Sequence, residues 1–270
     1  MRLDDHDAIA LRLAEIAIEA GDLLRRMEGS AGEPRIKGDG TPTTAADLAA
    51  ETLILSRLAQ TWPDVPSVAE ETANHALPGA HFFLVDPLDG TSDFIHGTGE
   101  YTVNVALIAG ARPVAGVVAA PALGRVWMAG TQARVGDVTS ADISWRPLSV
   151  RQAPPNGLVA LVSRRHGDQA SDACLATLSI STRRTASSAM KFCLIACGEA
   201  DIYVRCGPTM EWDTAAGDHI LCRAGGVVIG AGGASLTYGR EHVGYRNGPF
   251  AALGDPALAQ RLSLPLAVAS

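Results

Sequence analysis

The stretch Phe82-Phe83-Leu84-Val85-Asp86-Pro87-Leu88-Asp89-Gly90-Thr91 places two acids directly after four consecutive apolar residues. The apolar run is typical of a short strand that is buried on both faces of a sheet. Pro87 fixes its own φ and the chain turns there, so the carboxylates of Asp86 and Asp89 can converge on one point. Two such carboxylates repel each other unless a cation lies between them, and oxygen ligands of this kind suit Mg²⁺ or Mn²⁺.

Gly90 and Thr91 follow at a position where a helix can begin, and Gly90 has no side chain to block a close approach. The backbone N–H groups at the start of a helix form a ready site for an anion. Metal carboxylates beside an anion pocket are typical of a phosphate-processing centre. The pattern alone therefore indicates a Mg²⁺-dependent phosphotransfer or phosphatase site.

Further acids lie where they could complete this centre. Glu70 and Glu71 come at an expected strand end, after Pro66-Ser67-Val68-Ala69. Asp47 falls in the first turn of an expected helix, and Asp213 falls at the start of another. An acid in a first turn commonly caps its helix or complements the helix dipole, and adjacent loop glutamates are commonly solvated. The structural and the functional interpretation both stay open for these acids.

The N-terminal half is predicted to combine two helices with an antiparallel meander. Apolar spacing favours a helix over residues 7–27 and a second from 43 or 44 to 60. The apolar stripe of the second helix is expected to consist of Leu48, Thr52, Leu55 and Ala59. Besides the strand at 82–85, strands are expected at 101–109, 114–119 and 125–129, separated by glycine- and proline-containing turns.

The stretch from 130 to 157 is weakly patterned and contains Pro147, Pro154 and Pro155. We therefore place a boundary there between an N-terminal α+β subdomain, residues 1–155, and a C-terminal α/β subdomain, residues 156–270. Beyond it, strands are expected at 158–162, 200–205 and 227–229, and helices at 168–178, 188–197 and 213–224. This alternation predicts layered sheets and helices.

The composition, with 47% hydrophobic and 19% charged residues over 270 residues, is that of a globular protein rather than a disordered one. A net charge of −7 argues against a general nucleic-acid-binding protein. The start Met1-Arg2-Leu3-Asp4-Asp5 is acidic where a signal peptide is basic, and the longest apolar region is interrupted by glycine and prolines. These features predict a cytoplasmic protein without a transmembrane segment. The five cysteines have no metal-like spacing, which favours reduced core thiols.

Only two of the 22 basic residues are lysines, Lys37 and Lys191. A chain that otherwise uses arginine makes each lysine a candidate for a position where arginine substitutes poorly. Lys37 precedes the Asp47 segment, and Lys191 lies in the expected helix 188–197. A compact point charge at these positions could contact a phosphate, whereas the alternative interpretation is two solvated side chains.

Two motifs resemble the signatures of the inositol monophosphatase superfamily. The first, Phe83-Leu84-Val85-Asp86-Pro87-Leu88-Asp89-Gly90-Thr91-Ser92-Asp93-Phe94, resembles the pattern W/L-x-x-D-P-x-D-G-T-x-x-F. The second, Trp212-Asp213-Thr214-Ala215-Ala216-Gly217, resembles W-D-x-A-A-G, and Thr43-Thr44-Ala45-Ala46-Asp47 and Ala69-Glu70-Glu71 are similar to upstream elements. The resemblance implies one phosphatase-family domain over about residues 7–253. It also implies an α/β (α+β) fold, a layered α-β-α-β-α sandwich of the inositol monophosphatase and fructose-bisphosphatase type.

Within the superfamily, the chain most resembles the CysQ-type 3'(2'),5'-bisphosphate nucleotidases, through residues 100–108, 162–166, 191–196 and 207–213. It departs from them at Ser187-Ser188-Ala189-Met190-Lys191, where the nucleotidases usually have G-S-S-L-K. The resemblance implies a Mg²⁺-dependent, Li⁺-sensitive phosphatase of sulfur assimilation or nucleotide recycling. Its reaction would convert adenosine 3',5'-bisphosphate to AMP and phosphate.

The resemblance also implies roles for single residues. The implied ligands of two or three Mg²⁺ ions, with Mn²⁺ as an alternative, are Glu70, Asp86, Asp89, Asp213 and the Leu88 carbonyl. The implied catalytic residues are Asp47, Thr91 and Glu70, with Thr91 and Asp47 orienting and deprotonating the attacking water. The implied substrate-binding residues are Glu70, Leu88, Asp89, Gly90, Thr91, Ser188, Lys191 and Asp213.

Two other functions stay open at this point. The same metal centre would serve a phosphatase acting on inositol 1-phosphate or another sugar or polyol phosphate. A catalytically idle regulatory homologue is a second alternative, although each implied metal-ligand position carries its acid. The expected partner is a small-molecule phosphomonoester, the expected assembly is a monomer or a homodimer, and peripheral attachment at the inner face of the membrane is an alternative location.

Overall fold

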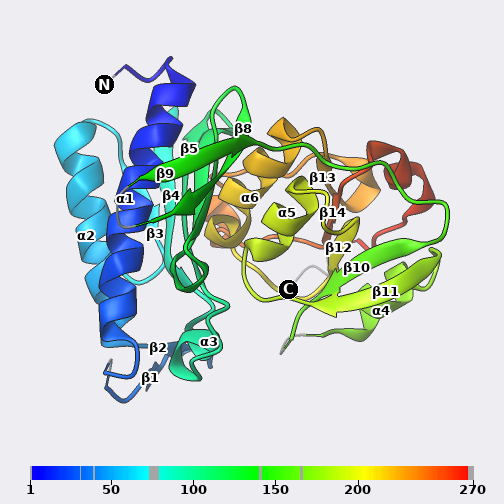
Figure 1. The fold of residues 1–270 in the computed structure, drawn as a ribbon, viewed down its shortest axis with the longest axis horizontal. Coiled ribbons are helices and arrows are strands. Elements are labelled where there is room, and N and C mark those ends of the chain that lie inside the picture. The colour runs from blue at the N-terminus through cyan, green and yellow to red at the C-terminus, as the bar shows by residue number, and fades with distance from the viewer. Residues whose placement is uncertain are drawn as a thin grey trace.

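Two stacked sheets separate three layers of helices in the computed structural model (Figure 1). The structure describes residues 2–30, 32–38, 40–72, 79–139, 142–164 and 167–266. Helices α1 (His6–Met27) and α2 (Ala45–Thr61) cover the outer face of a seven-stranded sheet. Helices α5 (Met190–Ala196) and α6 (Glu211–Arg223) lie between this sheet and a five-stranded one, and α4 (Gln169–Leu175) packs on the far face. The expected α-β-α-β-α sandwich is confirmed.

The two N-terminal helices form where the apolar spacing predicts them, but the predicted stripe of α2 is wrong. The buried residues of α2 are Ala46, Asp47, Ala50, Glu51, Ile54 and Leu58, whereas Leu48 is 41% exposed. Two alanines let the helix approach the sheet closely, and two buried acids share that face. A search for large apolar residues therefore selects the wrong side of the helix.

The seven-stranded sheet has the order β3-β4-β5-β6-β7-β8-β9, with only β3 and β4 pairing in parallel. Its strands are β3 (Ser67–Ala69), β4 (His81–Asp89), β5 (Thr102–Ala109), β6 (Arg112–Ala120), β7 (Arg125–Ala129), β8 (Ala133–Val138) and β9 (Ile143–Pro147). Along β4, Phe82 and Leu84 pack against the central helices, while Phe83 and Val85 pack against α1 and α2. The predicted strand buried on both faces is confirmed, as is the antiparallel meander.

Strands β8 and β9 correct the interpretation of residues 130–157 as weakly patterned connection. They continue the first sheet as far as Pro147, and β9 is the edge strand of that sheet. None of the five residues of β9 is fully buried, so the strand carries no strong apolar alternation. Pro147 is compatible with this edge position, because a strand end at an edge does not require its N–H.

The five-stranded sheet has the order β11-β10-β12-β14-β13. Its strands are β10 (Leu158–Val162), β11 (Ile180–Thr185), β12 (Ile202–Arg205), β13 (Val227–Gly230) and β14 (Phe250–Leu253). The predicted strands and helices of this half are present with shifted ends, but β11 and β14 were not predicted. β11 is a largely exposed polar edge strand, and β14 is a four-residue run with two alanines, so both give weak signals.

Shorter elements complete the described part of the chain: β1 (Arg35–Ile36), β2 (Pro42–Thr43), α3 (Thr91–Ile95) and the 3₁₀ turns η1 (Pro121–Leu123), η2 (Ala231–Gly233), η3 (Glu241–Val243) and η4 (Pro256–Arg261). The five cysteines are free thiols. Within the described ranges, none of the helices combines the length and the apolar character that a membrane crossing requires.

Candidate active site

The turn at the end of β4 brings Asp86 and Asp89 to the same side of the sheet. Asp86 pairs with Asn104 on β5, and Asp89 pairs with Thr102, so three steps along β4 correspond to two steps along β5. Residues two apart on a regular strand face the same side of the sheet. The irregularity in β4 likewise directs Asp86 and Asp89, which are three apart, to the same side. The convergence inferred from Pro87 therefore has a structural basis in this irregular pairing.

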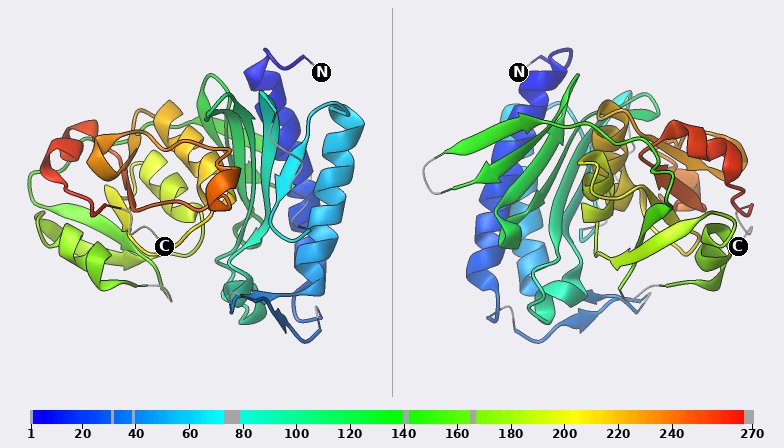
Figure 2. Two further views of the ribbon diagram at one scale, coloured as in Figure 1. Left: turned by 180° about the vertical axis from the view of Figure 1, so that it is seen from behind. Right: turned by 45° about the vertical axis from the view of Figure 1, so that its right-hand side comes forward.

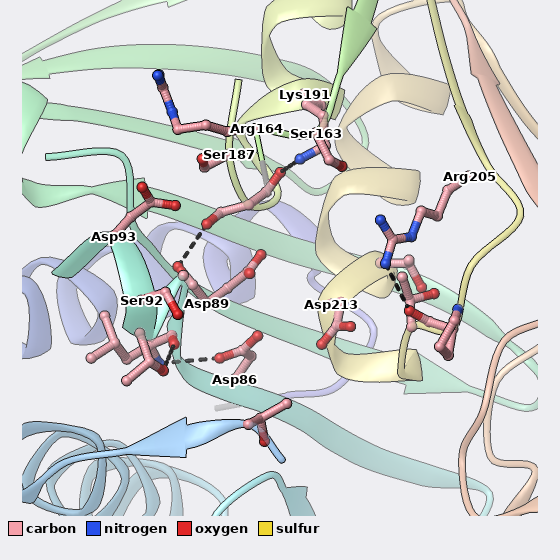
Figure 3. A pocket seen from close by; sticks show the side chains of 18 of the residues that line it. Asp86, Asp89, Ser92, Asp93, Ser163, Arg164, Ser187, Lys191, Arg205 and Asp213 are labelled. Carbon is pink, nitrogen blue, oxygen red and sulfur yellow. Dashed lines mark hydrogen bonds between the residues drawn. The ribbon is translucent and has the colours of Figure 1, made fainter. Parts of the chain in front are cut away.

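A cavity of about 450 Å³ opens at this turn, between the two halves of the molecule (Figure 3). Nine of the predicted site residues line it: Glu70, Asp86, Leu88, Asp89, Gly90, Thr91, Ser188, Lys191 and Asp213. They come from the end of β3, the end of β4, the start of α3, the N-terminal ends of α5 and α6 and their flanking turns. Residues far apart in the sequence thus meet in one pocket.

Three carboxylates form a compact acidic cluster in the pocket. Glu70, Asp86 and Asp213 each offer an oxygen atom, and these atoms lie within 4.8 Å of one another. Burial, reinforced by repulsion from the neighbouring acids, raises the pKa of Asp86 and of Asp213 well above the usual value. Burial likewise raises the pKa of Glu70 to about 7, although Lys37 opposes the shift. Such a set of buried carboxylate oxygens fits a divalent cation.

Asp89 lies beside this cluster and is held by the turn before α5 and by β5. Its Oδ2 accepts hydrogen bonds from the Ala189 N–H at 2.7 Å and from the Asn104 amide at 3.4 Å. Its backbone carbonyl accepts one from the Ser188 hydroxyl at 2.8 Å. Burial raises the pKa of Asp89, against the attraction of Lys191. One carboxylate oxygen of Asp89 is thus engaged by protein donors.

Asp47 lies behind the pocket wall and contacts Thr91. Asp47 Oδ1 accepts a hydrogen bond from the Thr91 hydroxyl at 2.9 Å. Its Oδ2 accepts from the Thr44 N–H at 2.8 Å and from the Thr44 hydroxyl at 2.6 Å, which caps α2. Burial raises the pKa of Asp47, and these donors partly counter it. The carboxylate of Asp47 therefore both caps α2 and contacts the site residue Thr91.

Gly90 is required by the local geometry. Its φ is +98°, and a Cβ built there would lie 2.4 Å from Ser188 Oγ. Only glycine adopts this conformation readily and leaves the space for Ser188. Thr91 and Ser92 then begin α3, and the first N–H groups of a helix have no partner within it.

The two lysines both lie at the site, in different environments. Lys37 Nζ is 2.7 Å from Glu70 Oε1 and 2.6 Å from Glu71 Oε1. Burial lowers the pKa of Lys37, but the two glutamates outweigh that effect and raise it. Lys191 is buried on α5, where Nζ donates to the Ser188 carbonyl at 2.9 Å and lies 4.9 Å from the Tyr203 ring centre. Burial lowers the pKa of Lys191 to about 8, although Asp89 opposes it.

The pocket has a second wall, whose two aromatic residues the sequence reasoning did not identify. Tyr203 and Phe250 line it and pack edge to face, with ring centres 5.6 Å apart. Arg205 and Arg164 add positive charge, and Figure 3 shows Arg205 beyond Asp213. Arg164 belongs to the nucleotidase-like stretch 162–166, whereas Tyr203 and Phe250 gave no chemical signal, because aromatic side chains on strands are common. Arg165 and His166, part of the nucleotidase-like stretch, lie outside the described residues.

Glu51 is a further residue that the sequence did not reveal. It is fully buried on α2, one helical turn after Asp47. Its carboxylate accepts hydrogen bonds from the backbone N–H groups of Glu71 and Thr72, both at 2.8 Å. Glu51 therefore fixes the turn that carries Glu70. Glu51 follows Asp47 by four residues, which places both acids on one face of the helix, and this spacing could have indicated Glu51 from the sequence.

The chain matches the model of the inositol monophosphatase family over residues 5–262. It is 39% identical over 233 residues to the 3'(2'),5'-bisphosphate nucleotidase CysQ of Salmonella typhimurium (strain LT2), which covers 84% of this chain and 92% of that protein. The 3'(2'),5'-bisphosphate nucleotidase CysQ of Escherichia coli (strain K12) is 36% identical with the same coverage.

Solved structures agree with this assignment. CysQ from Bacteroides thetaiotaomicron, a bacterial member of the inositol monophosphatase family, superposes with a TM-score of 0.76 at 29% identity, covering 93% of this chain and 98% of that one. The Thermotoga maritima IMPase superposes with a TM-score of 0.78 at 21% identity, covering 94% and 95%, which supports the fold. The chain therefore belongs to the inositol monophosphatase family and is a phosphoric monoester hydrolase.

Proposed function

We propose that this protein is a Mg²⁺-dependent phosphatase that hydrolyses the 3'-phosphate of adenosine 3',5'-bisphosphate to AMP and phosphate. The observation that carries the proposal is the composition of the pocket at the end of β4. It combines an acidic cluster around Asp86 with a cationic and aromatic wall formed by Lys191, Arg205 and Tyr203. The similarity to CysQ nucleotidases of several bacteria supports the same substrate class.

The acidic cluster would hold the metal ions. Glu70, Asp86 and Asp213 would bind Mg²⁺, together with Asp89 and the Leu88 carbonyl at the rim of the cluster. Bound Mg²⁺ supplies Lewis-acid stabilisation of phosphoryl oxygens and lowers the pKa of water. Burial is the main cause of the raised pKa values of Asp86 and Asp213, and repulsion between the acids adds to it when no cation is bound.

Thr91 and Asp47 would handle the proton of the attacking water. The Thr91 hydroxyl donates to Asp47 at 2.9 Å and can at the same time accept a hydrogen bond from water in the pocket. Asp47 is held by Thr44 on its other oxygen, so the pair has a fixed orientation. This arrangement suits general-base assistance to water attack on phosphorus, with the sugar hydroxyl as the leaving group.

Selectivity for a nucleotide bisphosphate would come from the second wall. A substrate with two phosphates and a base requires a cation away from the metal centre and a flat apolar surface. Lys191 and Arg205 supply positive charge, while Tyr203 and Phe250 supply aromatic surface beside it. A polyol phosphate would leave this wall without a partner.

The test compares phosphate release by the purified protein from adenosine 3',5'-bisphosphate and from inositol 1-phosphate, with Mg²⁺ present. We expect kcat/KM for the bisphosphate to be at least about tenfold higher, a difference of about 1.4 kcal/mol. Asp89→Asn serves as the inactive control. A preference for inositol 1-phosphate would support the polyol phosphatase instead, and no release from either substrate would support an idle homologue.

Several finer expectations stay predictions. They are inhibition by Li⁺, the use of Mn²⁺, a role in sulfur assimilation or nucleotide recycling, action in the cytoplasm, and assembly as a monomer or homodimer. Inclusion of LiCl in the same assay, at constant ionic strength set with KCl, tests the first of them.

A further inference from the structure

The segment between β13 and β14 returns to the start of α6 and contacts it from outside the pocket. Met210, the residue before α6, forms an isolated bridge with Arg246. The Glu211 N–H donates to the Tyr245 carbonyl at 2.8 Å, and the Asn247 N–H donates to the Thr209 carbonyl at 2.9 Å. Tyr245 is buried with a φ of +58°, an unfavourable conformation that the surrounding packing maintains.

Asn247 is the centre of these contacts. Its Nδ2 lies 2.7 Å from the Met210 carbonyl, 3.0 Å from Thr214 Oγ1 and 3.2 Å from Thr209 Oγ1. Thr209 and Thr214 line the pocket, whereas Asn247 is absent from the residues that line it. The amide group therefore joins the residues on both sides of Asp213 without reaching the pocket.

Arg240 orients the Asn247 amide. Its Nη2 donates to Asn247 Oδ1 at 3.0 Å, and its Nε donates to Glu211 Oε1 at 3.0 Å. Glu211 is fully buried and also accepts from the backbone N–H of Arg240 at 3.1 Å. Because Oδ1 of Asn247 faces a guanidinium donor, its Nδ2 is directed at the start of α6.

Asp213 depends on the same residue, Met210. Its Oδ2 accepts a hydrogen bond from the Met210 N–H at 2.8 Å, while Asn247 binds the Met210 carbonyl. Asp213 is repelled by Asp89 and Glu70, so its place in the cluster requires a firm attachment. We propose that Asn247, oriented by Arg240, is a positioning residue that holds Asp213 at the metal centre through Met210. The inference rests on the proposed metal centre.

The test is a calorimetric titration of the full chain with Mn²⁺ and no substrate. We expect Asn247→Ala to weaken Mn²⁺ binding by about tenfold, the lower end of the range for loss of a direct partner of a metal ligand, because Asn247 acts through Met210. Arg240→Ala is also expected to weaken Mn²⁺ binding. If Asn247→Ala does not fold, the Mn²⁺ affinity of Arg240→Ala decides the question. Mn²⁺ binding as tight as in the wild type in the folded variants would overturn the proposal.

Arg151→Ala is the matched control. Arg151 forms a partly buried pair with Asp201, with both hydrogen bonds at 2.7 Å, but neither residue lines the pocket. Arg151→Ala should lower the thermal midpoint and leave Mn²⁺ affinity unchanged, whereas equal weakening of Mn²⁺ binding in this variant would count against the proposal.

Asp213→Asn separates failure of the proposed metal centre from failure of the role proposed for Asn247. If it leaves Mn²⁺ affinity unchanged, the metal centre itself is wrong; if it alone weakens binding, only the role of Asn247 is wrong.

Discussion

Asp47 and Asp213 show how one carboxylate serves a helix and a site together. Each is the third residue of its helix and accepts the N–H of the residue that precedes the helix, Thr44 or Met210. Each uses Oδ2 for this bond, and Asp47 uses Oδ1 for Thr91. An acid at this position is stabilised by the helix dipole, so the cap and the site are compatible.

Asp47→Asn should separate catalysis from metal binding. An amide in place of the carboxylate retains the shape but removes the proton acceptor behind Thr91. We expect kcat to fall by about 10²–10⁴-fold, the range typical of general-base groups, with Mn²⁺ affinity retained. Titration calorimetry and steady-state kinetics measure both quantities. The control is Asp5→Asn, which alters the cap of α1 only; equal losses of Mn²⁺ affinity and turnover would place Asp47 among the metal ligands.

Lys191→Met should raise KM for the bisphosphate more than it lowers kcat. The buried ammonium lies in the pocket wall, held by the Ser188 carbonyl and the Tyr203 ring. A hydrogen bond to a charged group contributes about 1.5–3 kcal/mol, which corresponds to about a 10–100-fold change in KM. Lys191→Arg should not restore the wild-type value, because the larger planar group does not fit the same carbonyl partners. An unchanged KM in Lys191→Met would contradict this assignment.

Helices α5 and α6 approach closely because a glycine faces an aromatic ring. A Cβ on Gly217 would lie 2.6 Å from the Phe192 ring. Alanine at this position should therefore destabilise the protein by about 1–3 kcal/mol through overpacking, although alanine favours a helix by about 1 kcal/mol. Urea unfolding measures the change. Adding Phe192→Leu should recover part of the loss, and a gain of stability in Gly217→Ala alone would show that the helices can separate freely.

His219, on α6, gives the protein a predictable acid response. It is 3% exposed, and its Nε2 lies 2.9 Å from the Gly130 carbonyl. Burial lowers its pKa from 6.5 to about 4. As pH falls, the unfolded chain binds this proton at a higher pH than the folded protein does. The stability that depends on neutral His219 is therefore fully present above pH 6.5 and is lost as pH falls towards 4. The loss approaches about 3 kcal/mol.

Urea unfolding at several pH values tests this response. His219→Gln keeps a side-chain N–H that can donate to Gly130 but does not titrate. The variant should lose less stability than the wild type between pH 6.5 and 4. The same pH dependence in both proteins would show that His219 is not responsible.

Asp89 connects the first sheet to the turn before α5 at the pocket. The acid belongs to β4 of the first sheet, and its donors Ser188 and Ala189 belong to the turn before α5 in the second half. Lys191 comes from the same helix, and Asp213 comes from α6. Occupancy of the metal centre should therefore affect the stability of the whole molecule.

Removal of metal should lower the thermal midpoint at neutral pH. Without a cation, the carboxylates of the cluster repel one another in a buried site. A ligand at about 100 times its Kd stabilises a protein by about 2.7 kcal/mol, so Mg²⁺ should raise the midpoint relative to EDTA. Differential scanning calorimetry measures the shift, which should shrink in Asp86→Asn. Equal midpoints in EDTA and in saturating Mg²⁺ would contradict a metal centre at the cluster.

The sequence was most informative where one local rule acts alone. The apolar run before Asp86 predicted a strand buried on both faces, and the spacing along residues 7–27 predicted α1. It was least informative where burial depends on distant partners. The buried face of α2 carries alanines and acids, and the edge strands β9 and β11 are largely exposed, so hydrophobic periodicity does not describe them.

By itself, the sequence determined the family and the chemical types of the site, because two motifs and two shorter upstream elements hold the acids, the glycine and the threonine in fixed local order. Only the tertiary structure decided which residues support them. Glu51 holds the Glu70 turn, Asn247 contacts the start of α6, and Lys191 lies between a carbonyl and an aromatic ring. The Glu51 and Asn247 contacts join residues that are 20 and 37 positions apart in the sequence, and side-chain packing rather than local spacing brings those segments together.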